Sequence, residues 1–231
     1  LFRKTSRIKV SLKNFKPNAQ IIKNIYSIAI PSGVMTSLPS ILVALLNSLL
    51  ATVSQTAIAF FGIYFKLQSF IYMPANGLIQ GMRPLISYNY GARHFDRVKK
   101  IIKVSIISTA VILCCGTIIF MGLPELVLSW FNATEQLLEI GIIGLRVISP
   151  CFILSTMGVV ISGVFESLGK GRQSLTISLL RQFIITLPLA YILLKVIGLN
   201  GIWLSFVIAE GIASVIAVIL IKKELHNFKV D

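Results

Sequence analysis

Six long apolar runs constrain this chain more than any other feature of its sequence. They lie at about 25–53, 57–82, 101–121, 140–165, 175–196 and 201–221. A helix needs about 20 residues to cross a hydrocarbon core of about 30 Å, and each run is long enough. None of the runs alternates polar and apolar residues as the strands of a membrane barrel do. The sequence therefore predicts an all-α integral membrane protein, a bundle of six transmembrane helices.

Composition excludes a soluble fold. Hydrophobic residues make up 55% of the 231 residues, charged residues only 13%, and the mean hydropathy is +0.86. One core in a soluble domain of this length does not bury so much apolar surface, whereas lipid solvates the outward faces of membrane helices.

The basic residues predict the orientation. Most of the 22 lysines and arginines fall in four blocks on one side of the predicted bundle, at 3–23, 83–103, 170–172 and 222–229. The connections on the other side carry Glu125, Glu135 and Glu139 instead. Because positive loops stay in the cytoplasm, we expect both termini inside a multi-pass protein of the cell membrane. The net charge of +14 thus reflects topology, and no folded basic domain is present to bind nucleic acid.

The apolar runs and the basic segments at either end divide the chain into three parts. Residues 1–24 form a basic cytoplasmic segment, residues 25–222 the six-helix bundle, and residues 223–231 a cytoplasmic tail. The first residue is leucine and no signal peptide is recognisable, so we expect a fragment or a processed chain.

Ionisable residues inside the spans are candidates for function, since charges in the bilayer are costly. Lys66 and Glu210 both lie near the predicted midplane and are compatible with an ion pair. Glu166 and Arg181 are expected to pair near the inner rim. For all four residues a static structural role is the alternative.

A segment rich in glycine and proline overlaps the end of the second span and continues into the basic connection after it. It contains Pro74, Gly77, Gln80, Gly81, Pro84, Tyr88, Asn89 and Gly91. Glycines permit close approach or positive φ, and Pro84 is expected to end the helix or force a turn. From the residues alone this is an amphipathic cytoplasmic connection.

In these residues the chain resembles the multidrug and toxic compound extrusion (MATE) transporters. The segment is similar to their signature loop after the eighth of twelve helices, and further similar stretches follow in order. They are Phe165-Glu166-Ser167-Leu168-Gly169, Arg181-Gln182 with Pro188, and Gly198-Leu199-Asn200-Gly201-Ile202-Trp203. The resemblance extends over residues 20–225.

The resemblance implies that the chain is the C-terminal lobe of a twelve-helix exporter. Residues 1–23 are then the linker to a missing N-terminal six-helix lobe, which is the expected partner together with the bilayer. Such transporters export small amphiphilic molecules by alternating access, driven by Na⁺ or H⁺.

The chain departs from the resemblance in its carboxylates. Some members place cation-binding carboxylates in the seventh and tenth helices, where this chain has Pro39 and Met157. We therefore expect no cofactor here and a coupling ion bound in the N-terminal lobe. Asn47, Met73 and Met157 become candidates for the cavity wall beside Lys66 and Glu210, since thioether and amide groups suit varied amphiphilic cations.

Other functions fit these residues less well. A lipid-linked oligosaccharide flippase of the same superfamily would carry several buried arginines, and only Arg181 qualifies. A membrane enzyme lacks an acid–base set, and no metal-ligand spacing occurs, so we expect neither catalysis nor a metal site. A non-catalytic membrane subunit stays an alternative.

Overall fold

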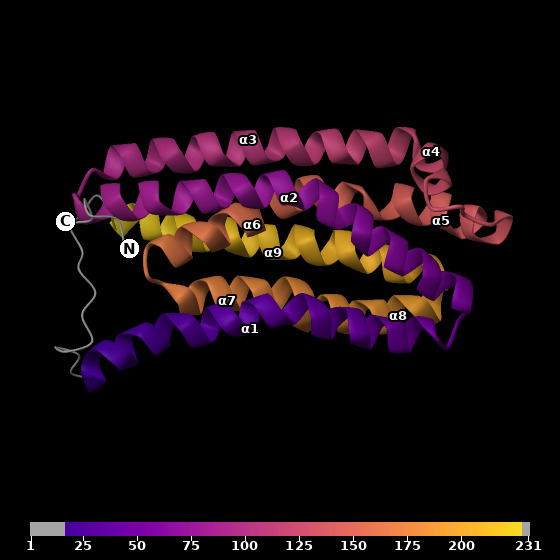
Figure 1. Cartoon of the computed structure of the whole chain (residues 1–231), viewed down its shortest axis with the longest axis horizontal. Helices are drawn as coiled ribbons and strands as arrows, with labels where there is room; N and C mark the ends of the chain where they lie inside the picture. The colour runs from indigo at the N-terminus through magenta and orange to yellow at the C-terminus, as the bar shows by residue number, and fades with distance from the viewer. Residues whose placement is uncertain (1–16, 228–231) are drawn as a thin grey trace, which may run out of the picture.

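A computed structural model describes residues 17–227, and all regular structure in that range is helical (Figure 1). The elements are α1 (Ala19–Leu50), α2 (Gln55–Gly91), α3 (Phe95–Gly122), α4 (Pro124–Ser129), α5 (Glu135–Ile148), α6 (Pro150–Ser167), α7 (Gly171–Leu179), the π-helical turn η2 (Leu180–Ile184), α8 (Thr186–Ile197) and α9 (Leu199–Asn227).

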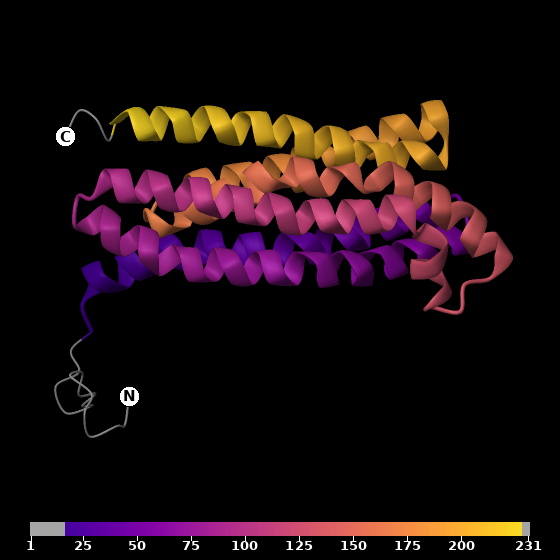
Figure 2. The same ribbon diagram turned by 90° about the horizontal axis from the view of Figure 1, so that it is seen from above.

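Within the described residues, six helical segments are long and apolar enough to cross a membrane, which confirms the predicted bundle. They are α1, α2, α3, α6, the broken helix from Gly171 to Ile197, and α9. The segments run side by side, with α9 on the far side of the bundle from α1 (Figures 1 and 2). Most of the predicted linker and tail, residues 1–16 and 228–231, lies outside the described range.

The ends of the helices follow from local chemistry. Asn18 caps α1, its side chain accepting hydrogen bonds from the backbone N–H groups of Gln20 and Ile21. Ser54 caps α2 in the same way. Gly198 takes a positive φ of 70° and so ends α8 at little steric cost, which lets α9 begin at the next residue.

A proline breaks the fourth predicted span. The run at 140–165 is two helices, α5 and α6, which meet at Ser149 and Pro150. Proline has no N–H to continue the ladder. At this break the Ser149 carbonyl accepts from the Phe152 N–H at 3.0 Å and from the Thr117 hydroxyl of α3 at 3.1 Å, which ties the junction to the neighbouring helix.

The buried core has an aromatic centre at the end of the bundle away from the start of α1. Trp203 and Phe60 are fully buried and meet edge to face, with ring centroids 5.1 Å apart. Gly144 lies under the Phe60 ring, where a Cβ would be 2.4 Å from a ring carbon. Glycine is required at that position because any side chain would collide with the ring.

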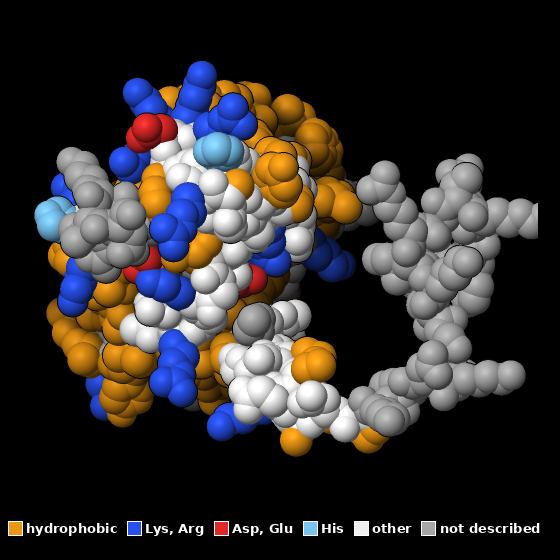
Figure 3. Space-filling model, turned by 90° about the vertical axis from the view of Figure 1, so that its left-hand side faces the viewer, with side chains coloured by type: hydrophobic (Ala, Val, Ile, Leu, Met, Phe, Trp, Pro, Cys, Tyr) orange, Lys and Arg blue, Asp and Glu red, His pale blue; other side chains and the backbone are white. Residues whose placement is uncertain are grey.

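The opposite end of the bundle is basic. The starts of α1, α3 and α7 and the ends of α2, α6 and α9 lie together there (Figure 1). Lysine and arginine side chains gather on this end (Figure 3), as the loop charges predict.

The glycine- and proline-rich segment is not a loop, and this prediction was wrong. All of its residues from Pro74 to Gly91 lie within α2, which continues through Pro84. Gly77, Gly81 and Gly91 do not have positive φ, and an added Cβ would meet nothing within 4 Å at any of them. In a membrane helix, neighbouring polar groups can donate to the backbone carbonyl that a proline leaves without its N–H partner, so the helix continues. The turn itself comes later, at Arg93, whose φ is 56°.

Candidate functional site

A π-helical turn interrupts the broken helix at Leu180–Ile184. The backbone N–H of Ile185 donates to the Leu180 carbonyl at 3.1 Å, and the Thr186 hydroxyl donates to the carbonyl of Arg181. Pro188 follows and has no N–H to donate to the Ile184 carbonyl. Such turns are frequent at functional sites because they reorient a side chain inside an otherwise regular helix. Here the turn carries Arg181.

Arg181 forms a buried ion pair with Glu210 of α9. Its Nε and Nη2 donate to the same oxygen, Glu210 Oε1, at 3.0 and 2.6 Å. The two side chains are only 14% and 12% exposed. The second carboxylate oxygen, Oε2, is covered and has no hydrogen-bond partner among the described residues. A buried pair with one unsatisfied oxygen is expensive to maintain, which marks it as a candidate for function.

The pair lies beside a cavity of about 520 Å³ between α1, α2, η2 and α9. Its wall combines apolar and aromatic side chains with amides and the ion pair: Pro39, Leu42, Phe65, Gln68, Ser69, Tyr72, Met73, Asn76, Arg181, Gln182, Phe206 and Glu210. A largely apolar hollow with a few convergent polar groups is the usual form of a site for a small organic molecule.

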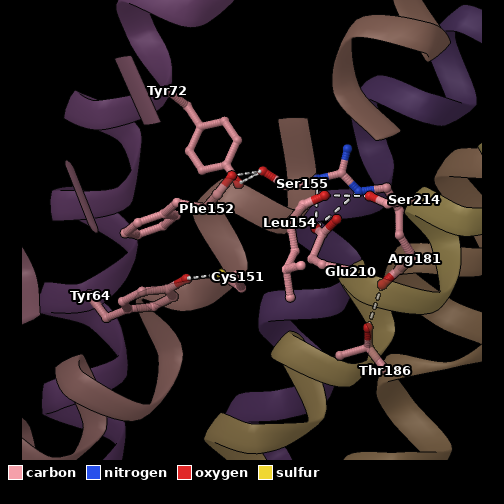
Figure 4. Close-up of polar contacts among 10 residues, drawn as sticks. All are labelled: Tyr64, Tyr72, Cys151, Phe152, Leu154, Ser155, Arg181, Thr186, Glu210 and Ser214. Atoms are coloured by element: carbon pink, nitrogen blue, oxygen red, sulfur yellow. Dashed lines mark hydrogen bonds and ion pairs between the residues drawn. The ribbon is translucent and has the colours of Figure 1, made fainter. Parts of the chain in front are cut away.

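Polar contacts connect this cavity to α6 (Figure 4). The Tyr72 hydroxyl is 2.6 Å from the Ser155 hydroxyl. Ser155 donates to the Phe152 carbonyl at 2.8 Å, so Tyr72 is the donor to Ser155. Ser214 of α9 donates to the carbonyl of Leu154. These bonds hold α2 and α9 to α6 on either side of the ion pair.

The structure divides the five predicted cavity residues. Met73 and Glu210 line the cavity. Lys66 is exposed, and Lys66, Asn47 and Met157 are not among the lining residues. Lys66 precedes Met73 by seven residues and so lies on the same side of α2, about two turns nearer the start of the helix. Glu210 is held by Arg181, and the Lys66–Glu210 pair is not formed among the described residues.

The predicted pair of Glu166 with Arg181 was wrong. Arg181 lies roughly 15 Å along the helix from Gly171 at a rise of about 1.5 Å per residue, too deep for the rim. Glu166 instead pairs with Arg83 of α2 at 2.8 Å and accepts a hydrogen bond from Ser174 at 3.2 Å.

Other contacts complete a polar rim at the basic end. Lys170 pairs with Glu224 of α9 at 2.5 Å, and the Ser87 hydroxyl donates to the Ser167 carbonyl at 2.8 Å. Gln80 accepts a long hydrogen bond of 3.4 Å from Arg83, and the Asn89 side chain donates to the Leu85 carbonyl at 2.8 Å. The Tyr88 side chain is exposed. The glycine- and proline-rich segment thus forms part of the end of α2 and contributes contacts at this rim.

Among the described residues no cluster of three or more His, Cys, Asp or Glu side chains is placed to hold a metal ion. The chemistry that the cavity offers is recognition by charge, hydrogen bonds and aromatic surface.

Comparison with known sequences identifies the family. The sequence model of the MatE family matches residues 31–192. This chain belongs to the MatE family. It is 30% identical over 230 residues to the multidrug export protein MepA of Staphylococcus haemolyticus, covering 99% of this chain and 50% of that protein. It is likewise 30% identical to MepA of Staphylococcus aureus strain RF122, over 97% of this chain and 49% of the relative. The chain thus spans about half the length of the relatives it matches.

Solved structures agree on the fold. An outward-facing MATE multidrug resistance transporter of the MOP superfamily superposes with a TM-score of 0.91 at 20% identity, covering 99% of this chain and 52% of that one. A MOP superfamily transporter from Pyrococcus furiosus gives a TM-score of 0.89 at 22% identity, covering 97% and 51%. The six-helix unit of this MatE chain is therefore one lobe of the larger fold.

Sequence reasoning placed Arg181 and Glu210 in the bilayer but missed their pairing. The signal was depth: Arg181 lies roughly 15 Å from Gly171, and Glu210 roughly 17 Å from Ile221, at about 1.5 Å per residue from the same end of the bundle. The row of Gln68, Tyr72 and Asn76, each four residues apart, also pointed to a polar face on α2.

Proposed function

We propose that this chain is the C-terminal half of a cation-coupled antiporter that exports organic cations or other amphiphilic small molecules by alternating access. Its role is transport across the cell membrane and not catalysis. The observation that carries the proposal is the cavity beside the buried Arg181–Glu210 pair, in a chain of the MatE family whose relatives are named as multidrug export proteins.

The lining of the cavity supports amphiphilic substrates. Phe65, Tyr72 and Phe206 offer aromatic faces, which attract flat apolar groups and cations. Met73 offers a flexible thioether that adapts to different shapes. Gln68 and Asn76 supply amide donors and acceptors on the same wall. A surface of this kind accepts many related molecules and is selective for none of them.

The ion pair determines how the cavity wall interacts with a charged substrate. Arg181 and Glu210 compensate each other, so the wall is neutral overall while it presents an anion and a cation side by side. We propose that Glu210 attracts the cationic group of a substrate and that Arg181 keeps the carboxylate ionised in the absence of a substrate.

The coupling ion, Na⁺ or H⁺, is proposed to bind in a second six-helix lobe. Pro39 and Met157 stand where a carboxylate would be needed in the first and fourth spans, and neither is a ligand for a hard cation. Glu210, the carboxylate of the cavity, is proposed to contact the cationic group of the substrate and not the coupling ion, and its Oε1 is held by Arg181.

The basic end of the bundle is proposed to face the cytoplasm, with both termini there. The support is the concentration of lysine and arginine at that end (Figure 3) together with the positive-inside rule. A cysteine introduced at Lys223 is then labelled by a membrane-impermeant thiol reagent only after permeabilisation, whereas one at Glu135 is labelled in intact cells.

Accumulation of ethidium in a drug-sensitive bacterial host tests the transport proposal. Cells that express the transporter containing this lobe should accumulate less ethidium than cells with an empty vector. Dissipating the Na⁺ and H⁺ gradients together should abolish the difference. Accumulation that is lowered equally with and without gradients would refute coupling.

A matched pair of variants tests the site. Glu210→Gln should lose most of the protection against ethidium, because it removes the anion of the cavity. Glu139→Gln makes the same charge change on an exposed residue of α5 and should transport like the wild type. If Glu210→Gln is poorly expressed, the double variant with Arg181→Gln removes the uncompensated charge. Full transport by that double variant would eliminate the role of the pair.

A further inference from the structure

A second hollow lies outside the cavity, in the groove between α2 and α3. Its volume is about 490 Å³, close to that of the cavity. Leu78, Gly81, Met82 and Leu85 line it from α2, and Lys100, Ile101, Val104, Ser105 and Ser108 line it from α3. Leu85 and Val104 are 55% and 54% exposed, so the groove is open to the surroundings of the bundle.

The groove is apolar along its length and cationic at one end. Lys100 belongs to the first turns of α3, at the basic end of the bundle (Figure 3). It is exposed and forms none of the ion pairs among the described residues, whereas its neighbour Lys99 pairs with Asp96. Arg97 is exposed and precedes Lys100 by three residues and Ile101 by four, so it lies on the same side of α3. The end of the groove therefore presents two cations to a negative group.

Ser105 adds a hydroxyl below the cations. It lines the groove roughly 7 Å further into the bundle than Lys100 at about 1.5 Å per residue. Its hydroxyl makes no side-chain hydrogen bond with another described residue, although serine in a helix often donates to the carbonyl four residues earlier. A hydrogen-bond donor is thus available between the charged end and the apolar floor.

Gly81 forms that floor. An added Cβ there would meet nothing within 4 Å, so no neighbouring helix requires this glycine. A glycine in a helix interior is less favourable than alanine, and its use as an open floor explains why it stands here.

We propose that the α2–α3 groove binds a membrane phospholipid with an anionic headgroup. The headgroup phosphate lies between Lys100 and Arg97, the Ser105 hydroxyl donates to an ester carbonyl, and an acyl chain runs over Gly81 between Leu78 and Val104. Charge complementarity selects the anionic lipid, and the apolar groove retains its chain. The site is independent of the transported substrate.

Lipid binding to the purified complete protein tests the proposal. Native mass spectrometry in detergent should detect bound phosphatidylglycerol in preference to phosphatidylcholine of the same acyl chains. Since a basic residue near the surface contributes about 1 kcal/mol toward an anionic lipid, Lys100→Gln should weaken phosphatidylglycerol binding about fivefold. Phosphatidylcholine binding should not change. Gly81→Leu fills the floor and should weaken both lipids.

Two controls match these changes. Lys103→Gln removes an exposed lysine that does not line the groove, and Gly62→Leu adds the same side chain in open space on another side of α2, away from the groove. Both should bind phosphatidylglycerol like the wild type. Because Lys100 is exposed, Lys100→Gln keeps the test decisive even if Gly81→Leu folds poorly.

Several outcomes would overturn the proposal. Equal loss in Lys100→Gln and Lys103→Gln would indicate only general attraction of anionic lipid to the basic end. Displacement of the lipid by inorganic phosphate alone would indicate a free-anion site. Unchanged lipid binding in both Lys100→Gln and Gly81→Leu would indicate that another part of the protein covers the groove.

Discussion

Helix α2 borders two hollows of similar size and different chemistry. Toward α1 and α9 it lines the cavity of about 520 Å³, whose wall includes a buried ion pair and several amides. Toward α3 it lines the groove of about 490 Å³, whose wall is apolar apart from Lys100 and two serines. Volume alone therefore says little about the ligand. The polar groups and their burial decide it, since a desolvated charge acts far more strongly than one at a wet rim.

The largest effect should follow from breaking the pair in the cavity. Arg181→Met leaves Glu210 buried and uncompensated, so we expect a loss of about 3–5 kcal/mol of stability. The midpoint of thermal unfolding in detergent, measured with a thiol-reactive or tryptophan fluorescence readout, reports this loss. If Arg181→Met unfolds like the wild type, the pair is hydrated and the contrast with the groove disappears.

A smaller effect is expected at the cavity wall. Tyr72→Phe removes the donor to Ser155, whose own hydroxyl still donates to the Phe152 carbonyl. One hydrogen bond is lost and no buried donor is stranded, so the expected cost is about 1 kcal/mol. Thermal unfolding compared with Tyr88→Phe, which changes an exposed tyrosine, provides the measurement and its control. A cost as large as that of Arg181→Met would mean that Tyr72 belongs to the ion-pair network.

At the floor of the groove a substitution should stabilise the protein instead of destabilising it. Gly81→Ala adds a methyl group into open space within α2 and should stabilise the lipid-free protein by about 0.5–1 kcal/mol. Unfolding in lipid-free detergent measures the gain. Gly144→Ala is the opposite case, because its Cβ would collide with the Phe60 ring. Destabilisation by Gly81→Ala would show that a contact occupies the groove in the folded protein.

The smallest effect is expected at the mouth of the groove. Lys100→Met removes a solvated charge that has no partner among the described residues, and stability in lipid-free detergent should change by less than about 0.5 kcal/mol. The same unfolding assay measures it, repeated with phosphatidylglycerol present. A large change without lipid would place Lys100 in an interaction internal to the protein.

Much of the fold could be predicted from the sequence. Length and apolarity set the six spans, and the loop charges correctly placed the basic residues at one end, because both rules describe the bilayer and not the contacts inside the protein. Helix breaks were harder. Pro150 does interrupt its span, but Pro84 does not, because the effect of a proline depends on what else satisfies the freed carbonyl.

The site was predicted less well, because the sequence does not show which of several charges at similar depth pair with one another. Met73 and Glu210 line the cavity, whereas Lys66, seven residues before Met73 on the same side of α2, is exposed and does not line it, and Glu210 pairs with Arg181 instead. Arg181 was assigned to the inner rim together with Glu166 because the fifth span was predicted to start at 175, whereas the helix starts at Gly171 and places Arg181 deeper. The π-helical turn that contains Arg181 has no clear sequence signature beyond the nearby Pro188.

That turn has a consequence for the whole of the broken helix. In a regular α-helix each residue advances the side chain by about 100°. A π-helical turn accommodates one extra residue, so α8 is rotated by roughly that angle relative to the course set by α7. Deleting a single residue within 180–184 would therefore restore regular winding while the side chains of α8 keep their present neighbours. The two halves of this helix therefore differ in phase, and Arg181 stands where the phase changes.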